Sequence, residues 1–154
     1  MTAVHLSLAQ RIGAVVDSFW GACLGATVYA AWAVWANWDA GLHVALRAGL
    51  THWAMSTFLT YTGTGTMRRL YRFGRGRIEA ATLCFSGGLL YTYALLIAAH
   101  VSVGTAHIGL TLSAGVIPNI VFCGSYTLLR SRTQTLRKST PRHSNEPFAH
   151  EPTT

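Results

Sequence analysis

Residues 66–79 read TMRRLYRFGRGRIE and place five arginines within ten positions. Long apolar segments lie on both sides of this stretch, and a second basic cluster follows between Arg130 and Arg142. Taken alone, arginines interleaved with aromatic residues are typical of RNA-binding segments. Between apolar segments they favour a cytoplasmic loop that joins two transmembrane hairpins and touches anionic lipid headgroups. We therefore expect membrane lipids as partners, and no nucleic acid, for the side chains of Arg68, Arg69, Arg72, Arg75 and Arg77.

The composition favours the membrane class. The chain has 154 residues, of which 51% are hydrophobic and 11% are charged, with a mean hydropathy of +0.32. Soluble domains carry about 25% charged residues. Several apolar runs approach the length of roughly 20 residues that a helix needs to cross a bilayer. We predict an all-α integral membrane protein with a single transmembrane domain.

Four apolar segments predict four transmembrane helices, arranged as two helical hairpins within residues 12–130. The expected helices cover about 12–36, 42–62, 80–101 and 106–129. The second helix either ends near residue 62 or continues into the arginine stretch. Pro118 predicts a kink in the fourth helix. Residues 1–11 are expected to form a short cytoplasmic segment. Residues 131–154 lack apolar periodicity, which predicts a disordered basic-to-polar cytoplasmic tail.

The distribution of Lys and Arg predicts the orientation. Five lie in the arginine stretch and five in the tail, whereas the two outer turns have none apart from Arg47 at the start of the second helix. By the positive-inside rule, both termini face the cytoplasm. We expect a multi-pass protein of the bacterial inner membrane.

A shift of 66 residues aligns the two halves of the chain. The aligned pairs include Phe19 with Phe85, Gly21 with Gly87, Leu24 with Leu90, Leu42 with Ile108 and Leu46 with Leu112. An internal duplication of one hairpin explains these matches, and chance among common residues is the alternative. Transporters built from repeats keep their sites where the repeats meet near mid-membrane.

Polar residues of the second and fourth helices mark the candidate site. His52, Ser56 and Thr60 recur at helical spacing and share one face. Pro118 and Asn119 lie at a similar depth in the fourth helix, since the 66-residue shift aligns His52 with Pro118. A polar stripe facing lipid is costly, so we expect these residues to line the bundle interior or a cavity. We predict substrate contacts there, with a plain interhelical hydrogen bond as the alternative.

Two further groups of residues are weaker candidates for a functional role. Asp39, His43, His100 and His107 lie towards the outer side, where imidazole and carboxylate groups can bind zinc or copper or relay protons. Their spacing fits no known ligand motif, so solvated interfacial histidines are the alternative, and we expect no resident metal or cofactor. Gly21 and Gly25 form a GxxxG pair, which favours helix packing within the chain or against a partner.

No catalytic constellation is present in the sequence. There is no Ser-His-Asp set in a convincing context, no glycine-rich phosphate loop and no pair of carboxylates, so an enzyme is not expected, although a small lipid-modifying enzyme stays open. We expect a protein that assists translocation of a lipid-linked or amphipathic solute, working as a homo-oligomer. The alternative is a non-catalytic accessory or assembly subunit of a larger membrane complex.

The length, the four helices, the two hairpins and the basic ends of the second and fourth helices resemble the GtrA-like family of small membrane proteins. That family is linked to the translocation of polyprenyl-phosphate-linked sugars, which is what the resemblance implies for this chain. In the family, those two helices end in an asparagine, aromatic and arginine pattern. The matching stretches here, TGTGTMRRLYRF and FCGSYTLLRSR, contain no asparagine. The resemblance is therefore architectural, and it assigns no residue a role.

Overall fold

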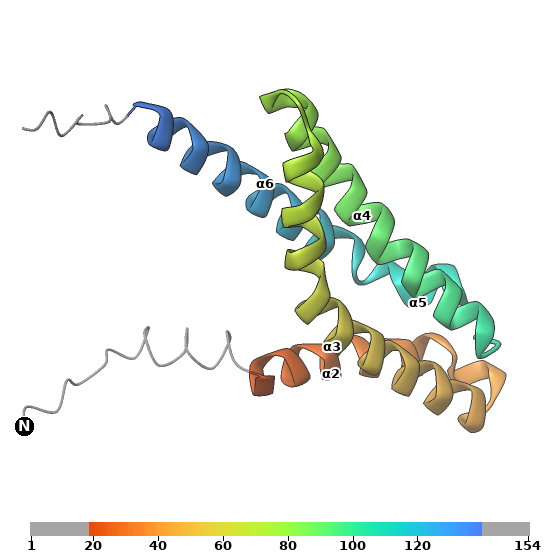
Figure 1. Ribbon diagram of the computed structural model, residues 1–154. Coiled ribbons are helices and arrows are strands. Elements are labelled where there is room, and N and C mark those ends of the chain that lie inside the picture. The colour runs from red at the N-terminus through yellow and green to blue at the C-terminus, as the bar shows by residue number, and fades with distance from the viewer. Residues whose placement is uncertain (1–18, 140–154) are drawn as a thin grey trace, which may run out of the picture.

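The structure is a computed structural model that describes residues 19–139, with the side chains of residues 22–133. All secondary structure within residues 19–139 is helical (Figure 1). The elements are α2 (Phe19–Ala36), the 3-10 helix η1 (Trp38–Ala40), α3 (Leu42–Phe73), α4 (Arg77–Ser102), α5 (Ile108–Ser113) and α6 (Val116–Ser139). The predicted all-α class is confirmed for this part of the chain. The predicted segment 1–11, the start of the first helix and residues 140–154 lie outside the described residues.

Among the described helices, α4 is the one that is long and apolar enough to cross a membrane. It has 26 residues and a mean hydropathy of 1.6 in its most apolar window. A shorter apolar stretch covers Ala22–Ala36 of α2. α3 and α6 have 32 and 24 residues but do not meet the same apolar criterion. The four membrane spans and the cytoplasmic position of both termini therefore stay predictions.

α3 extends through most of the arginine stretch. It ends at Phe73 instead of near residue 62, so the first three arginines lie on a helix and not in a loop. Arg, Leu and Met are good helix formers, which explains the continuation. The helix stops at Gly74, where a Cβ would overlap the backbone of Ala80 in the first turn of α4. The connection between α3 and α4 is therefore reduced to residues 74–76.

The predicted fourth helix is divided into α5 and α6. α5 ends at Ser113 and α6 begins at Val116, so the interruption lies before Pro118 and not at it. Pro118 is in the first turn of α6, where a backbone N–H has no intrahelical partner to lose. α6 continues to Ser139, so residues 131–139 of the predicted disordered tail are helical.

The helices pack in sequence order, and α3 changes direction along its length (Figure 1). Its first part packs against α2 and its second part against α4; α4 also packs against α6, and α2 against α5. Near the middle of α3, Thr60 Oγ1 donates to Ser56 O at 2.9 Å, and Thr62 Oγ1 donates to Phe58 O at 3.0 Å. Such hydroxyl bonds to the preceding turn bend helices, and Gly63 adds backbone freedom nearby.

Two regions of close contact hold the packed helices together. Gly49 of α3 lies so close to α2 that a Cβ there would overlap Val34 and lie 3.1 Å from Ala30 O. At the other end of α3, a buried core is formed by Met67, Tyr71, Ala80, Cys84 and Cys123. Small residues and sulfur-containing side chains thus bring the helices together.

The glycine pair predicted to pack the first helix has a different environment. Gly25 is exposed, and nothing lies within 4 Å of the position that a Cβ would take. The side-chain surroundings of Gly21 lie outside the described residues. The close approach of α2 and α3 is made at Gly49 instead, so the prediction that Gly25 packs within the chain is wrong.

Candidate functional site

A cavity of about 630 Å³ lies between α2, α3, α4 and the α5–α6 segment. All five residues predicted to contact a substrate line it: His52, Ser56, Thr60, Pro118 and Asn119. The bend and the length of α3 bring its polar face opposite the start of α6. Pro118 and Asn119 belong to the first turn of α6 and line the cavity together with that face.

The rest of the cavity wall is mixed in chemistry. Further polar side chains come from Tyr29, Tyr61, Thr64 and Thr92. Apolar and small residues complete it: Ala22, Leu59, Gly63, Met67, Gly88, Leu96, Leu112, Gly115, Phe122 and Cys123. Such a wall suits a ligand that has both polar and apolar parts.

His52 is hydrogen-bonded to a second buried histidine. Its Nδ1 lies 3.0 Å from Nε2 of His100 on α4, and Nδ1 of His100 lies 2.8 Å from Oγ1 of Thr105. His52 is 3% exposed and His100 is 0% exposed. The ring of Tyr29 lies 6.1 Å from that of His52, centroid to centroid. The sequence groups His100 with the residues of the outer side, whereas the structure buries it in the last turn of α4, beside His52.

The other residues predicted to lie on the outer side do not gather into one site. His107 Nε2 lies 3.1 Å from Asp39 Oδ2, and both side chains are largely exposed. His43 is exposed in the first turn of α3. Within the described residues, no group of three His, Cys, Asp or Glu side chains is placed to hold a metal ion. The four weak metal candidates are therefore separated into His100 beside His52, the His107–Asp39 pair and a lone His43.

A buried asparagine fixes the end of the bundle at which α2 meets α3. Asn37 follows α2 and is 0% exposed. Its Nδ2 donates to Ala33 O and to Thr111 Oγ1, both at 2.8 Å, and its Oδ1 accepts from the backbone N–H of His107 at 2.9 Å. These bonds tie the α2–α3 corner to α5. No pattern in the sequence predicts this role of Asn37.

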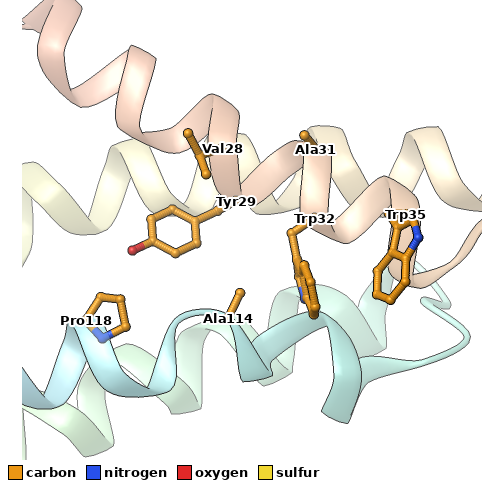
Figure 2. Close-up of a pocket in the computed structure, with 7 residues that line it drawn as sticks. All are labelled: Val28, Tyr29, Ala31, Trp32, Trp35, Ala114 and Pro118. Atoms are coloured by element: carbon orange, nitrogen blue, oxygen red, sulfur yellow. The ribbon is translucent and has the colours of Figure 1, made fainter.

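A second hollow lies between α2 and the α5–α6 segment (Figure 2). It is an open groove of about 560 Å³ with a mainly apolar wall, and its residues are Val28, Tyr29, Ala31, Trp32, Trp35, Ala114 and Pro118. Figure 2 shows Tyr29 and Trp32 projecting from α2 towards Pro118 and Ala114. Trp32 Nε1 donates to Leu110 O at 2.9 Å, which anchors that wall. Tyr29 and Pro118 line both the groove and the cavity.

The five arginines of residues 68–77 are all exposed, at the end of α3, in the connection and at the start of α4. They lie at the opposite end of α3 from Asp39. None of them lines the cavity or the groove, so they are separate from the candidate site.

The chain matches no protein-family model, no curated protein and no solved structure. The architectural resemblance noted above therefore gains no support from these comparisons, and the function is argued from the site alone.

Proposed function

We propose that this chain is a multi-pass membrane protein that assists the translocation of a lipid-linked or amphipathic solute. The observation that carries the proposal is that a cavity of mixed polarity and an apolar groove share two wall residues, Tyr29 and Pro118. The cavity volume of about 630 Å³ falls within the range of roughly 300–1,000 Å³ that is usual for small-molecule sites.

The surface of the helices supports a membrane environment. Only 22% of the most apolar window of α4 is buried within the protein, whereas the core helix of a soluble protein is mostly buried. Large apolar side chains are also exposed along α2, α3 and α6, among them Leu24, Val28, Leu46, Leu50, Ile117, Val121 and Leu128. Exposed apolar surface on this scale is typical of contact with lipid or with other membrane helices.

The two hollows suit the two parts of an amphipathic solute. The groove offers the apolar faces of Val28, Trp32 and Trp35 to a hydrocarbon chain. The cavity offers His52 and Asn119 to a polar head. A solute with its chain in the groove would reach the cavity by passing Tyr29 and Pro118, without drawing its chain out of the lipid.

Equivalent positions support a duplicated hairpin. α2 and α4 end 66 residues apart, at Ala36 and Ser102, and α3 and α5 begin at the same spacing. Three pairs of residues at this spacing line the cavity: Ala22 with Gly88, His52 with Pro118, and Ser56 with Phe122. Two hairpins of one orientation would place both termini on the side of the exposed arginines, which the positive-inside rule assigns to the cytoplasm.

The groove also favours an oligomer. It is open on the surface, so a second copy of the chain packed over it would turn it into an enclosed path. Four helices enclose little volume by themselves, and a path shared between protomers removes that restriction.

Transport of a fluorescent polyprenyl-phosphate-linked sugar across liposomes tests the proposal. Liposomes that contain the wild-type protein should expose the inner-leaflet probe to an external quencher, and His52→Leu and Asn119→Leu should abolish this exposure. His43→Leu is the matched control, because His43 is exposed and does not line the cavity. Full activity of both cavity variants, with normal insertion, would count against the proposal.

An accessory role is the second candidate, and the exposed Gly25 favours it. A small residue with open space around it gives a partner helix room for close approach. Gly25→Leu should then release a partner from cross-linked membranes, whereas His52→Leu should not. Retention of every cross-linked product in the Gly25→Leu protein would argue against this role.

A further inference from the structure

A continuous line of hydrogen bonds connects the cavity to the turn after α4. It starts at His52, which lines the cavity, and passes through His100 to Thr105. The two steps measure 3.0 Å and 2.8 Å between heavy atoms, which are ordinary hydrogen-bond lengths. All three side chains are buried. Ionisable residues buried in membrane helices are expensive to keep, and chains of them commonly carry protons.

We propose that the His52–His100 pair is a proton-binding site that relays protons between the cavity and the turn at Thr105. A neutral imidazole carries one hydrogen, so one of its nitrogens donates and the other accepts. At 3.0 Å, one of the two facing nitrogens must donate and the other must accept. The pair therefore has two complementary arrangements.

In the first arrangement, His52 Nδ1–H donates to His100 Nε2, and His100 Nδ1–H donates to Thr105 Oγ1. Nε2 of His52 is then an acceptor. In the second, His100 Nε2–H donates to His52 Nδ1, the Thr105 hydroxyl donates to His100 Nδ1, and Nε2 of His52 carries a hydrogen. Only the positions of hydrogens differ, because the heavy atoms already lie within hydrogen-bond distance.

Conversion of the first arrangement into the second moves one proton along the chain. A proton from the cavity binds His52 Nε2, and the Nδ1 proton of His52 passes to His100 Nε2. The Nδ1 proton of His100 passes to Thr105 Oγ1, which releases its own proton towards solvent. One proton enters, one leaves and no other bond changes, so no oxidant or further reactant is needed.

The relay also changes the hydrogen bonding of His52 Nε2, which accepts in the first arrangement and donates in the second. Within the described residues, Nε2 of His52 has no recorded hydrogen-bond partner, while its ring lines the cavity. A phosphate or carboxylate oxygen in the cavity would favour the second arrangement, in which this nitrogen donates. This coupling rests on the proposed function, but the proton relay itself does not depend on any solute.

The groups around the relay are few. From α2, the ring of Tyr29 lies against His52, and α5 contributes no ionisable side chain. From α3, Arg47 Nη2 lies 3.4 Å from Gly104 O, next to Thr105. A fixed positive charge there disfavours a proton resting at the outer end, so a proton that arrives is released. The exposed Asp39–His107 pair is close in the chain, because His107 follows Thr105 by two residues and is the N-cap residue of α5.

Proton flux into liposomes tests the relay without a solute. A potassium diffusion potential drives protons inward, and an enclosed pH-sensitive dye reports the rate. His100→Gln retains a hydrogen-bonding side chain but cannot pass a proton through an amide, so the flux should fall by about a hundredfold, the scale that a positioned proton carrier contributes. Thr105→Val should lower the flux, Thr105→Ser should keep it, and His43→Gln should leave it unchanged.

A second measurement is independent of flux and of the membrane-spanning topology. In nanodiscs, nitrogen-15 labelled histidine should show a coupling across the hydrogen bond between His52 Nδ1 and His100 Nε2. Absence of that coupling in the folded protein, or wild-type flux no greater than that of protein-free liposomes, would overturn the relay. Full flux in His100→Gln or in Thr105→Val would do the same. If His100→Gln fails to fold, the two Thr105 variants decide. Failure of sugar translocation alone would remove the proposed solute and leave the relay standing.

Discussion

His52 Nδ1 and His100 Nε2 lie 3.0 Å apart, although 48 positions separate the two residues in the sequence. The bond joins α3 to α4 close to the cavity. Both side chains are buried, so each imidazole relies on the other for the hydrogen bond that water would otherwise supply.

Loss of one histidine should therefore destabilise the fold more than its own contacts suggest. His100→Leu leaves Nδ1 of His52 without its partner, a cost of about 1–3 kcal/mol for a buried polar group. The double variant His52→Leu/His100→Leu should lose less stability than the sum of the single variants, by roughly 0.5–3 kcal/mol. Unfolding in mixed detergent micelles, followed by circular dichroism, measures all four proteins. Strict additivity would mean that the two imidazoles are not coupled.

Gly49→Ala should weaken the contact between α2 and α3. A Cβ at this position would overlap Val34 Cγ2 and lie 3.1 Å from Ala30 O, so the helices must move apart. Overpacking of this kind costs about 1–3 kcal/mol. Gly25→Ala is the matched control, because its Cβ meets nothing within 4 Å and alanine improves helix propensity by up to about 1 kcal/mol. Thermal unfolding should shift in opposite directions for the two variants, and equal shifts would contradict the close contact.

Asn37→Ala should loosen the end of the bundle at which α2 meets α3. The change leaves Thr111 Oγ1 without the Asn37 amide donor and the N–H of His107 without an acceptor, at about 1–3 kcal/mol for each unsatisfied buried group. Asp39→Ala removes an exposed partner of His107 and should change stability little. Hydrogen exchange of the α5 amides should accelerate in the Asn37 variant alone. Equal exchange in both variants would show that Asn37 does not anchor α5.

Labelling with a membrane-impermeant maleimide should distinguish the two ends of α3. In a background in which Cys23, Cys84 and Cys123 are serine, Arg75→Cys should be protected in intact cells. Asp39→Cys, at the opposite end of α3, should react from outside. The expectation follows from the positive-inside rule. Reaction of both positions from one side would mean that α3 does not cross the membrane.

Helical periodicity was sufficient to predict which residues of α3 share a face. His52, Ser56 and Thr60 are each four positions apart, and a period of 3.6 residues places them in one row. Periodicity could not predict what lies opposite. His100 ends a long apolar run with no polar residue one turn before it, so nothing in the sequence distinguished a buried histidine from one at the surface. Its partner Thr105 belongs to a turn, where no periodicity applies.

Helix ends were predicted less well than helix positions. The change from apolar residues to polar and then basic ones after position 62 predicts a membrane boundary, but it does not end a helix, since arginine is a good helix former. The actual end at Phe73 depends on Gly74 and on the close approach of α4. Pro118 predicted a kink because proline usually disrupts a helix interior. Its place in the first turn of α6 depends on the interruption between α5 and α6, which the sequence did not reveal.

The shared position of Tyr29 and Pro118 has a consequence for selectivity. Both side chains border the groove and the cavity, so on the path proposed above a solute passes between a phenol ring and a pyrrolidine ring. The proline ring is rigid, whereas the tyrosine has two rotatable side-chain bonds. On the proposed path, a single rotamer change at Tyr29 would therefore alter the size of the largest head group that passes, while the proline ring keeps the opposite wall fixed.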